Sequence, residues 1–195
     1  MYPMTLAETA STFAEMILTD NLLNDPELDN KAKCFILDQS LGNAAVYLMD
    51  IPVRFDFEKN FYEERSKGEI PVSRLKEMIT DTQRDIFGDV LLKGGEDPLF
   101  WASKLHFYIT GVSFYNFPYA FGFLLSQGLY AMFKKEGEDF LPKYEKLLKL
   151  SGSGTCEDVV KEGIGEDLKQ PEFWARAVKS QLPLIEQLEH MLKIN

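Results

Sequence analysis

One histidine and a run of aromatic residues are concentrated in the stretch HFYITGVSFYNFPYAFG, residues 106–122. Tyr108, Tyr115 and Tyr119 carry hydroxyls that need hydrogen-bond partners if they are buried. His106 is one of only two histidines in the chain, and an imidazole takes up or releases a proton near neutral pH. The residues alone leave two interpretations open, because these groups suit a polar binding site and also suit an aromatic core.

Two carboxylates, Glu8 and Glu15, interrupt the apolar stretch LAETASTFAE near the N-terminus. Glu8 follows Thr5 by three residues, which is the spacing of a capping box at the start of a helix. Glu15 lies about two helical turns further on, so both carboxylates project from one face. Such a face is either solvated or a buried site, and the small neighbouring residues favour a helix that packs closely against another segment.

The elements that position these groups are predicted to be helices, because apolar residues recur at intervals of three and four along nearly the whole chain. Pro118 suits the first turn of the helix that follows the aromatic stretch, since its missing N–H has no partner there anyway. Gly and Ser at 151–154 predict a loop. The predicted helices cover residues 4–24, 26–47, 54–65, 74–92, 98–105, 119–135, 138–150, 155–162 and 171–193. Pro52 either interrupts or merely bends the chain between the second and third of these ranges, and the range 98–105 is short. We therefore expect an all-α protein of seven or eight helices with no strand and no internal repeat.

Length and composition narrow the class of protein. A chain of 195 residues with 45% hydrophobic residues predicts a single packed helical unit over residues 1–195. The formal net charge of −10 makes nucleic acid an unexpected partner. The longest apolar run is shorter than the about 20 residues that a membrane span needs, so we expect no membrane partner.

The two cysteines, Cys34 and Cys156, lie far apart and form no C-x-x-C motif. This arrangement predicts neither a disulfide framework nor a thiolate zinc site, and it fits a reducing cytoplasm.

These stretches resemble the C-terminal part of zinc oligopeptidases of the thimet oligopeptidase and oligoendopeptidase F group, with oligoendopeptidase F the more similar. LAETASTFAE is similar to the helix that follows the family's H-E-x-x-H helix. HFYITGVSFYNFPYAFGFLLSQGLY resembles the substrate-binding segment, and RFDFE and DLKQPEFW resemble further stretches. The resemblance covers almost the whole chain and implies part of the catalytic domain of a zincin-type metallopeptidase.

The resemblance also implies roles for individual residues. It places the third zinc ligand at Glu8, which outweighs the capping interpretation, and Glu15 resembles the acid that orients a ligand histidine. It implies that His106 and Tyr119 bind substrate and stabilise the oxyanion of the tetrahedral intermediate. Tyr115 competes with Tyr119 for this role, because the helical register is not fixed by spacing.

The sequence also departs from the family, since no H-E-x-x-H occurs in its 195 residues. We expect the two histidine ligands and the general base to lie upstream, so that one carboxylate would hold zinc weakly. The chain is then a C-terminal fragment of an enzyme that hydrolyses short peptides, and alone it is inactive. The alternative is a non-catalytic helical protein that binds peptides or a partner chain.

If the chain is a fragment, we expect an exposed apolar face where the missing helices would pack. This face is centred on Leu6, Phe13 and residues 115–121, and two copies are expected to dimerise through it.

Overall fold

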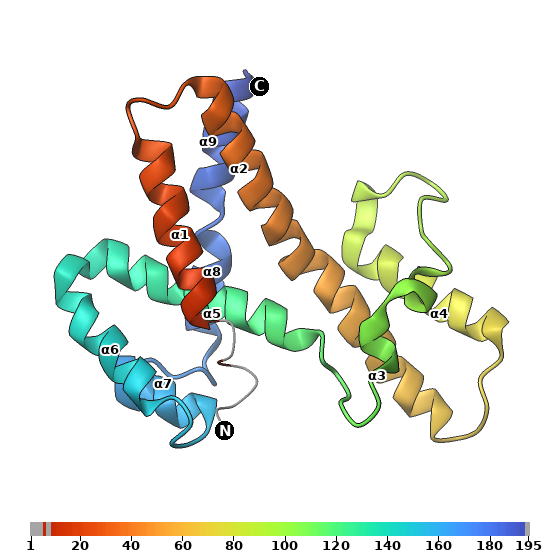
Figure 1. Ribbon diagram of the computed structural model, residues 1–195. Coiled ribbons are helices and arrows are strands. Elements are labelled where there is room, and N and C mark those ends of the chain that lie inside the picture. Colours follow the sequence, from red (N-terminus) through yellow and green to blue (C-terminus); the bar gives the residue numbers. More distant parts are fainter. Residues whose placement is uncertain (1–5, 7–8, 194–195) are drawn as a thin grey trace. The chain divides into compact units, whose positions relative to one another are not determined.

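The computed structural model describes residue 6 and residues 9–193, and it confirms the all-α class, because the described residues contain helices and no strand (Figure 1). The helices gather into two compact units. The terminal unit combines the residues up to Ala44 with those from Phe121 onward, and the middle unit is Ala45–Ala120. The single helical unit expected from the sequence stays a prediction, since each unit is characterised here by its own contacts.

The terminal unit is built from helices at both ends of the chain. Its helices are α1 (Thr9–Asn24), most of α2 (Asn30–Ala45), most of α5 (Phe117–Glu136), α6 (Leu141–Leu150), α7 (Cys156–Ile164), α8 (Pro171–Lys179) and α9 (Leu182–Leu192). Leu125 and Leu129 of α5 are four residues apart and therefore share one face, and both are fully buried. They pack in one core with Phe140, Val160 and Phe173.

Two glycines allow the helices of this core to approach closely. A Cβ at Gly163 of α7 would lie 2.9 Å from Leu147 Cα of α6, and α6 and α7 run side by side in Figure 1. A Cβ at Gly128 of α5 would lie 2.2 Å from the Phe173 ring. Both positions therefore require a residue without a side chain.

Leu6 and Phe13 were expected on an exposed apolar face, and this prediction is wrong. Their side chains are 8% and 3% exposed, respectively, and both belong to the core of the terminal unit. Phe13 contacts the rings of Tyr144, Tyr130 and Phe133, with centroids 4.5, 6.2 and 6.2 Å away. These aromatic partners come from α5 and α6, so the apolar side of α1 is covered from within the unit.

The middle unit consists of a π-helical turn, two α-helices and three 3₁₀ turns. They are η2 (Val46–Asp50), α3 (Ile51–Arg65), α4 (Val72–Phe87), η3 (Gly88–Val90), η4 (Phe100–Ser103) and η5 (Leu105–Tyr108). Its core contains Val53 and Phe57 of α3 and Met78 and Ile79 of α4. Phe107 of η5 meets Phe57 edge to face at 5.3 Å, so the last turn is anchored on the same core.

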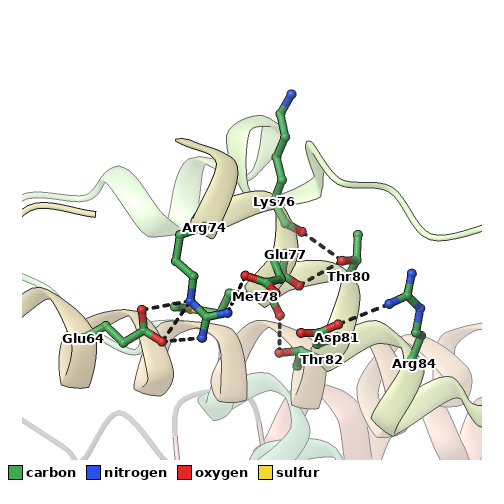
Figure 2. Close-up of polar contacts among 9 residues, drawn as sticks. All are labelled: Glu64, Arg74, Lys76, Glu77, Met78, Thr80, Asp81, Thr82 and Arg84. Atoms are coloured by element: carbon green, nitrogen blue, oxygen red, sulfur yellow. Dashed lines mark hydrogen bonds and ion pairs between the residues drawn. The ribbon is translucent and has the colours of Figure 1, made fainter. Parts of the chain in front are cut away.

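An ion-pair network on the surface joins α3 to α4. Figure 2 shows Arg74 of α4 facing Glu64 of α3, where the guanidinium donates from Nε at 3.0 Å and from Nη2 at 2.5 Å. Arg74 also donates to Glu77 at 2.7 Å. The hydrogen bond from Arg74 is the main reason that the pKa of the Glu64 carboxyl is held below its ordinary value.

The C-terminal helix predicted over residues 171–193 is divided in two. Helix α8 ends at Lys179 and α9 begins at Leu182, with Pro183 in the first turn of α9. Proline has no N–H to continue the hydrogen bonds of a preceding helix, and its ring clashes with the turn before it. The predicted helix therefore breaks before Pro183.

The helix predicted over residues 74–92 also has different ends. Its N-cap is Pro71, so Ser73 lies inside α4 and does not cap it, and the helix ends at Phe87 because Gly88 adopts a positive φ of 55°. The predicted helix over 98–105 is η4 instead, which ends where Lys104 turns to extended backbone. None of the helices in the described part of the chain is both long and apolar enough to cross a membrane.

Gly128→Ala tests the close approach of α5 and α8. The added methyl would overlap the ring of Phe173, which is 1% exposed and belongs to the core of the terminal unit. We expect a loss of about 1–3 kcal/mol in the free energy of unfolding, measured by urea denaturation.

The matched control is Gly42→Ala in α2, where no described atom lies within 4 Å of the added Cβ. This control is expected to gain up to about 1 kcal/mol from helix propensity. Equal stability of Gly128→Ala and the natural chain would contradict the packing described here.

Arg74→Met tests the Glu64 pair through its pH dependence. The pKa of folded Glu64 lies below its ordinary value of 4.5, so the stabilisation is complete above that pH and is lost as the pH falls through the lower folded pKa. Urea unfolding at pH about 6 and about 3 should therefore show a smaller acid-induced loss in Arg74→Met than in the natural chain. Lys76→Met, which removes an exposed cation from the same helix, is the control. An identical acid-induced loss in the natural chain and in Arg74→Met would show that the pair does not contribute.

Candidate functional site

The structure brings three of the predicted site residues together within the middle unit. His106 lies in η5, Tyr115 in the turn that precedes α5, and Tyr119 in the first turn of α5. The His106 ring stacks on Tyr115 with centroids 5.9 Å apart and an interplanar angle of 12°. Tyr119 meets both rings edge-on, 5.8 Å from His106 and 5.9 Å from Tyr115. The three rings form one cluster, called here the His–Tyr cluster.

All three side chains of the His–Tyr cluster are half-buried. Each has an apolar body and a polar edge, so partial burial holds the ring while the polar edge stays within reach of solvent or a ligand. An imidazole and two phenols offer hydrogen-bond donors and acceptors on one small patch. The arrangement therefore suits recognition of a polar group.

The start of α5 fixes Tyr119. Pro118 is buried in the first turn, as the sequence predicted, where its missing N–H costs no hydrogen bond. The Tyr119 N–H donates to the Asn116 carbonyl at 3.2 Å, which closes that turn. Asn116 is fully buried, so the residue that begins the turn is itself held in place.

Helix α3 holds the turn that carries Tyr115, through three residues that the sequence interpretation missed. Arg54 donates to Asn116 Oδ1 at 3.3 Å, and Glu58 Oε1 accepts from the Phe114 N–H at 2.7 Å. The Tyr62 hydroxyl lies 3.1 Å from Ser113 Oγ. The stretch RFDFEKNFY contained a signal for them, because Arg54, Glu58 and Tyr62 recur at every fourth position among its phenylalanines.

The backbone of this turn is unusual at Phe114, whose φ is 58°. A residue with a Cβ adopts this left-handed conformation at a cost of about 1–2 kcal/mol. The Phe114 ring packs against Phe55 at 5.4 Å and Tyr62 at 5.6 Å. These contacts with α3 offset the backbone cost.

Tyr108 lies in the same unit but makes a different contact. The Tyr108 hydroxyl donates to the Trp101 carbonyl at 3.4 Å and is exposed. Glu15 is exposed on α1 of the terminal unit. Glu8 lies outside the described residues. The roles of Glu8 and Glu15 stay predictions.

The described residues do not by themselves fit a zinc ion. Among them, no group of three or more His, Cys, Asp or Glu side chains lies together in a way that could hold a metal.

The fold of the whole chain is that of a helical oligopeptidase. It matches the crystal structure of oligoendopeptidase-F from Enterococcus faecium with a TM-score of 0.83 over 100% of this chain and 36% of that one, at 24% sequence identity. The family model Peptidase family M3 matches residues 1–180, and the chain belongs to this family.

Curated relatives agree with this assignment. The chain is 29% identical to Oligopeptidase PepF from Bacillus subtilis over 192 residues, and 26% identical to the plasmid-encoded Oligoendopeptidase F from Lactococcus lactis subsp. cremoris over 193 residues. Each alignment covers 98% of this chain but only 28% and 31% of the respective relative. The chain thus spans less than a third of the length of these relatives.

Proposed function

We propose that this chain provides the substrate-binding part, and one metal ligand, of a zinc oligopeptidase that hydrolyses short peptides. The observation that carries the proposal is the His–Tyr cluster, found in a chain of Peptidase family M3 whose relatives are named oligopeptidases. We also place the enzyme in the cytoplasm, because its two cysteines lie far apart in the sequence and form no C-x-x-C motif.

The chemistry of the cluster matches the needs of peptide hydrolysis. Attack on a peptide carbonyl places negative charge on its oxygen, and positioned donors that face this oxygen lower the barrier. Tyr119 is the better positioned donor, because its backbone is fixed by the first turn of α5. His106 and Tyr115 then bind neighbouring polar groups of the peptide.

The metal-binding part of the proposal concerns Glu8. A catalytic zinc site typically has three protein ligands, and one carboxylate binds the ion weakly. These 195 residues contain no H-E-x-x-H motif, so they lack its two ligand histidines and its general-base glutamate. A separate segment that carries H-E-x-x-H must therefore supply them, and Glu15 would orient one of the ligand histidines.

A non-catalytic peptide-binding protein is the second candidate, and the His–Tyr cluster favours it, because an imidazole and two phenols can bind a peptide without a metal. In that case the chain alone binds peptides. Trp101 lies in η4, just before the turn that holds His106. A peptide titration monitored by its fluorescence distinguishes the two, since a protein with an incomplete site should bind only weakly.

A quenched fluorescent peptide tests the catalytic proposal. With zinc, the chain alone should release no fluorescence, and the chain combined with the H-E-x-x-H segment of an oligoendopeptidase F should hydrolyse the peptide. Glu8→Gln should abolish this activity because the amide is a poor zinc ligand. Hydrolysis by the chain alone, or full activity of Glu8→Gln in the combination, would refute the proposed site.

Tyrosine-to-phenylalanine variants then assign the oxyanion donor. In the active combination, Tyr119→Phe should lower kcat by about 100-fold with little change in KM, because the phenol acts mainly in the transition state. Tyr115→Phe should have a smaller effect on kcat. Tyr108→Phe is the control, since its hydroxyl contacts the Trp101 carbonyl. A larger loss in Tyr115→Phe than in Tyr119→Phe would reverse the assignment.

A further inference from the structure

Four polar residues form a stripe along one side of the α3 region. Asp50, Arg54, Glu58 and Tyr62 follow one another at intervals of four, which places them on a single helix face. Asp50 pairs with Arg54, and the remaining three contact the segment before α5. The contacts run in reverse order along that segment, from Arg54 at Asn116, through Glu58 at Phe114, to Tyr62 at Ser113.

The central contact is a hydrogen bond from a backbone amide to a buried carboxylate. The Glu58 side chain is 4% exposed and accepts the Phe114 N–H at 2.7 Å across 56 residues of sequence. This hydrogen bond has a length at the short end of the range for N–H···O hydrogen bonds. It holds Phe114 in the left-handed conformation that a phenylalanine rarely adopts.

The surroundings of this stripe are not arranged for stability alone. Among the described residues, Arg54 Nε, Glu58 Oε2 and Asn116 Nδ2 are buried atoms without a hydrogen-bond partner. Buried polar groups left unpaired, together with a strained backbone, weaken a fold and are typically retained where they serve function. The strain here lies directly beside the His–Tyr cluster.

The stripe fixes the backbone on both sides of Tyr115. Its two neighbours in the chain, Phe114 and Asn116, are both bound to α3, so its backbone is fixed on each side. The Asn116 carbonyl in turn accepts the N–H of Tyr119. One helix face therefore determines where both tyrosines stand relative to His106.

We propose that Arg54, Glu58 and Tyr62 are positioning residues that hold Tyr115 and Tyr119 against His106 in the geometry that binds substrate. None of the three needs to touch the substrate. The structural part of this inference stands on the middle unit alone, and its catalytic consequence rests on the proposed peptidase function.

Hydrogen exchange on the 195-residue chain tests the structural part. Glu58→Ala removes the acceptor, and the Phe114 amide should then exchange at least about 10-fold faster. Glu58→Gln keeps an acceptor oxygen and should restore most of the protection. Asp56→Ala, an exposed acid on the same helix, is the control and should exchange as the natural chain does.

Tyr62→Phe is the second structural variant, because it removes one exposed hydroxyl and should leave the fold intact even if Glu58→Ala does not fold. It should accelerate exchange at Phe114 a few-fold by loosening Ser113. The inference is overturned if Tyr62→Phe leaves exchange at Phe114 unchanged and Glu58→Ala either leaves it unchanged as well or fails to fold.

Peptide hydrolysis by the chain combined with the H-E-x-x-H segment tests the consequence. Glu58→Ala should lower kcat by about 10–100-fold, and Glu58→Gln should recover most of the loss, because misplacement of binding groups is costly. If the natural chain hydrolyses peptides in this combination and Glu58→Ala does so at the same rate, the positioning role is refuted. No hydrolysis by the natural combination would refute the proposed function and leave the exchange result standing.

Discussion

The hydrogen bond between Glu58 and the Phe114 amide is the constraint on which the candidate site depends. The segment from Ile109 to Asn116 has no helix of its own, so its backbone groups need partners elsewhere. Helix α3 provides an acceptor for one of them, the Phe114 N–H, and its Arg54 donates to the Asn116 side chain. The loop that carries the candidate site residues is thus held by a regular helix, which is the common arrangement for binding residues.

The tyrosines of the two units differ in their surroundings. Tyr130 and Tyr144 of the terminal unit pack around Phe13, and burial raises the pKa of both phenols. For Tyr130, a hydrogen bond to Asp20 raises the pKa further. Tyr115 and Tyr119, in contrast, pack against His106 with part of each ring accessible. The former stabilise a core, whereas the latter are part of a half-buried cluster at the surface of the middle unit.

The features predicted correctly from the sequence are those that local patterns encode. Apolar periodicity identified the helical class, and Pro118 marked the start of α5. The aromatic stretch contained the three residues that cluster. The contacts of Glu58 and Arg54 span 56 and 62 residues, and no local pattern specifies such pairs. The burial of Phe13 was missed for the same reason, since its partners lie on α5 and α6.

The two halves of the proposed active site have different requirements for folding. Every contact that forms the His–Tyr cluster, and every contact that anchors its turn to α3, joins residues between Ala45 and Ala120. In the proposed enzyme, Glu8 comes from the other end of the sequence and is one of three metal ligands, the other two being the histidines of an H-E-x-x-H motif that these 195 residues do not contain. The contacts that organise the His–Tyr cluster use no metal ligand. The proposal therefore has peptide-binding groups that are positioned before the metal binds, and such preorganisation lowers the entropic cost of catalysis.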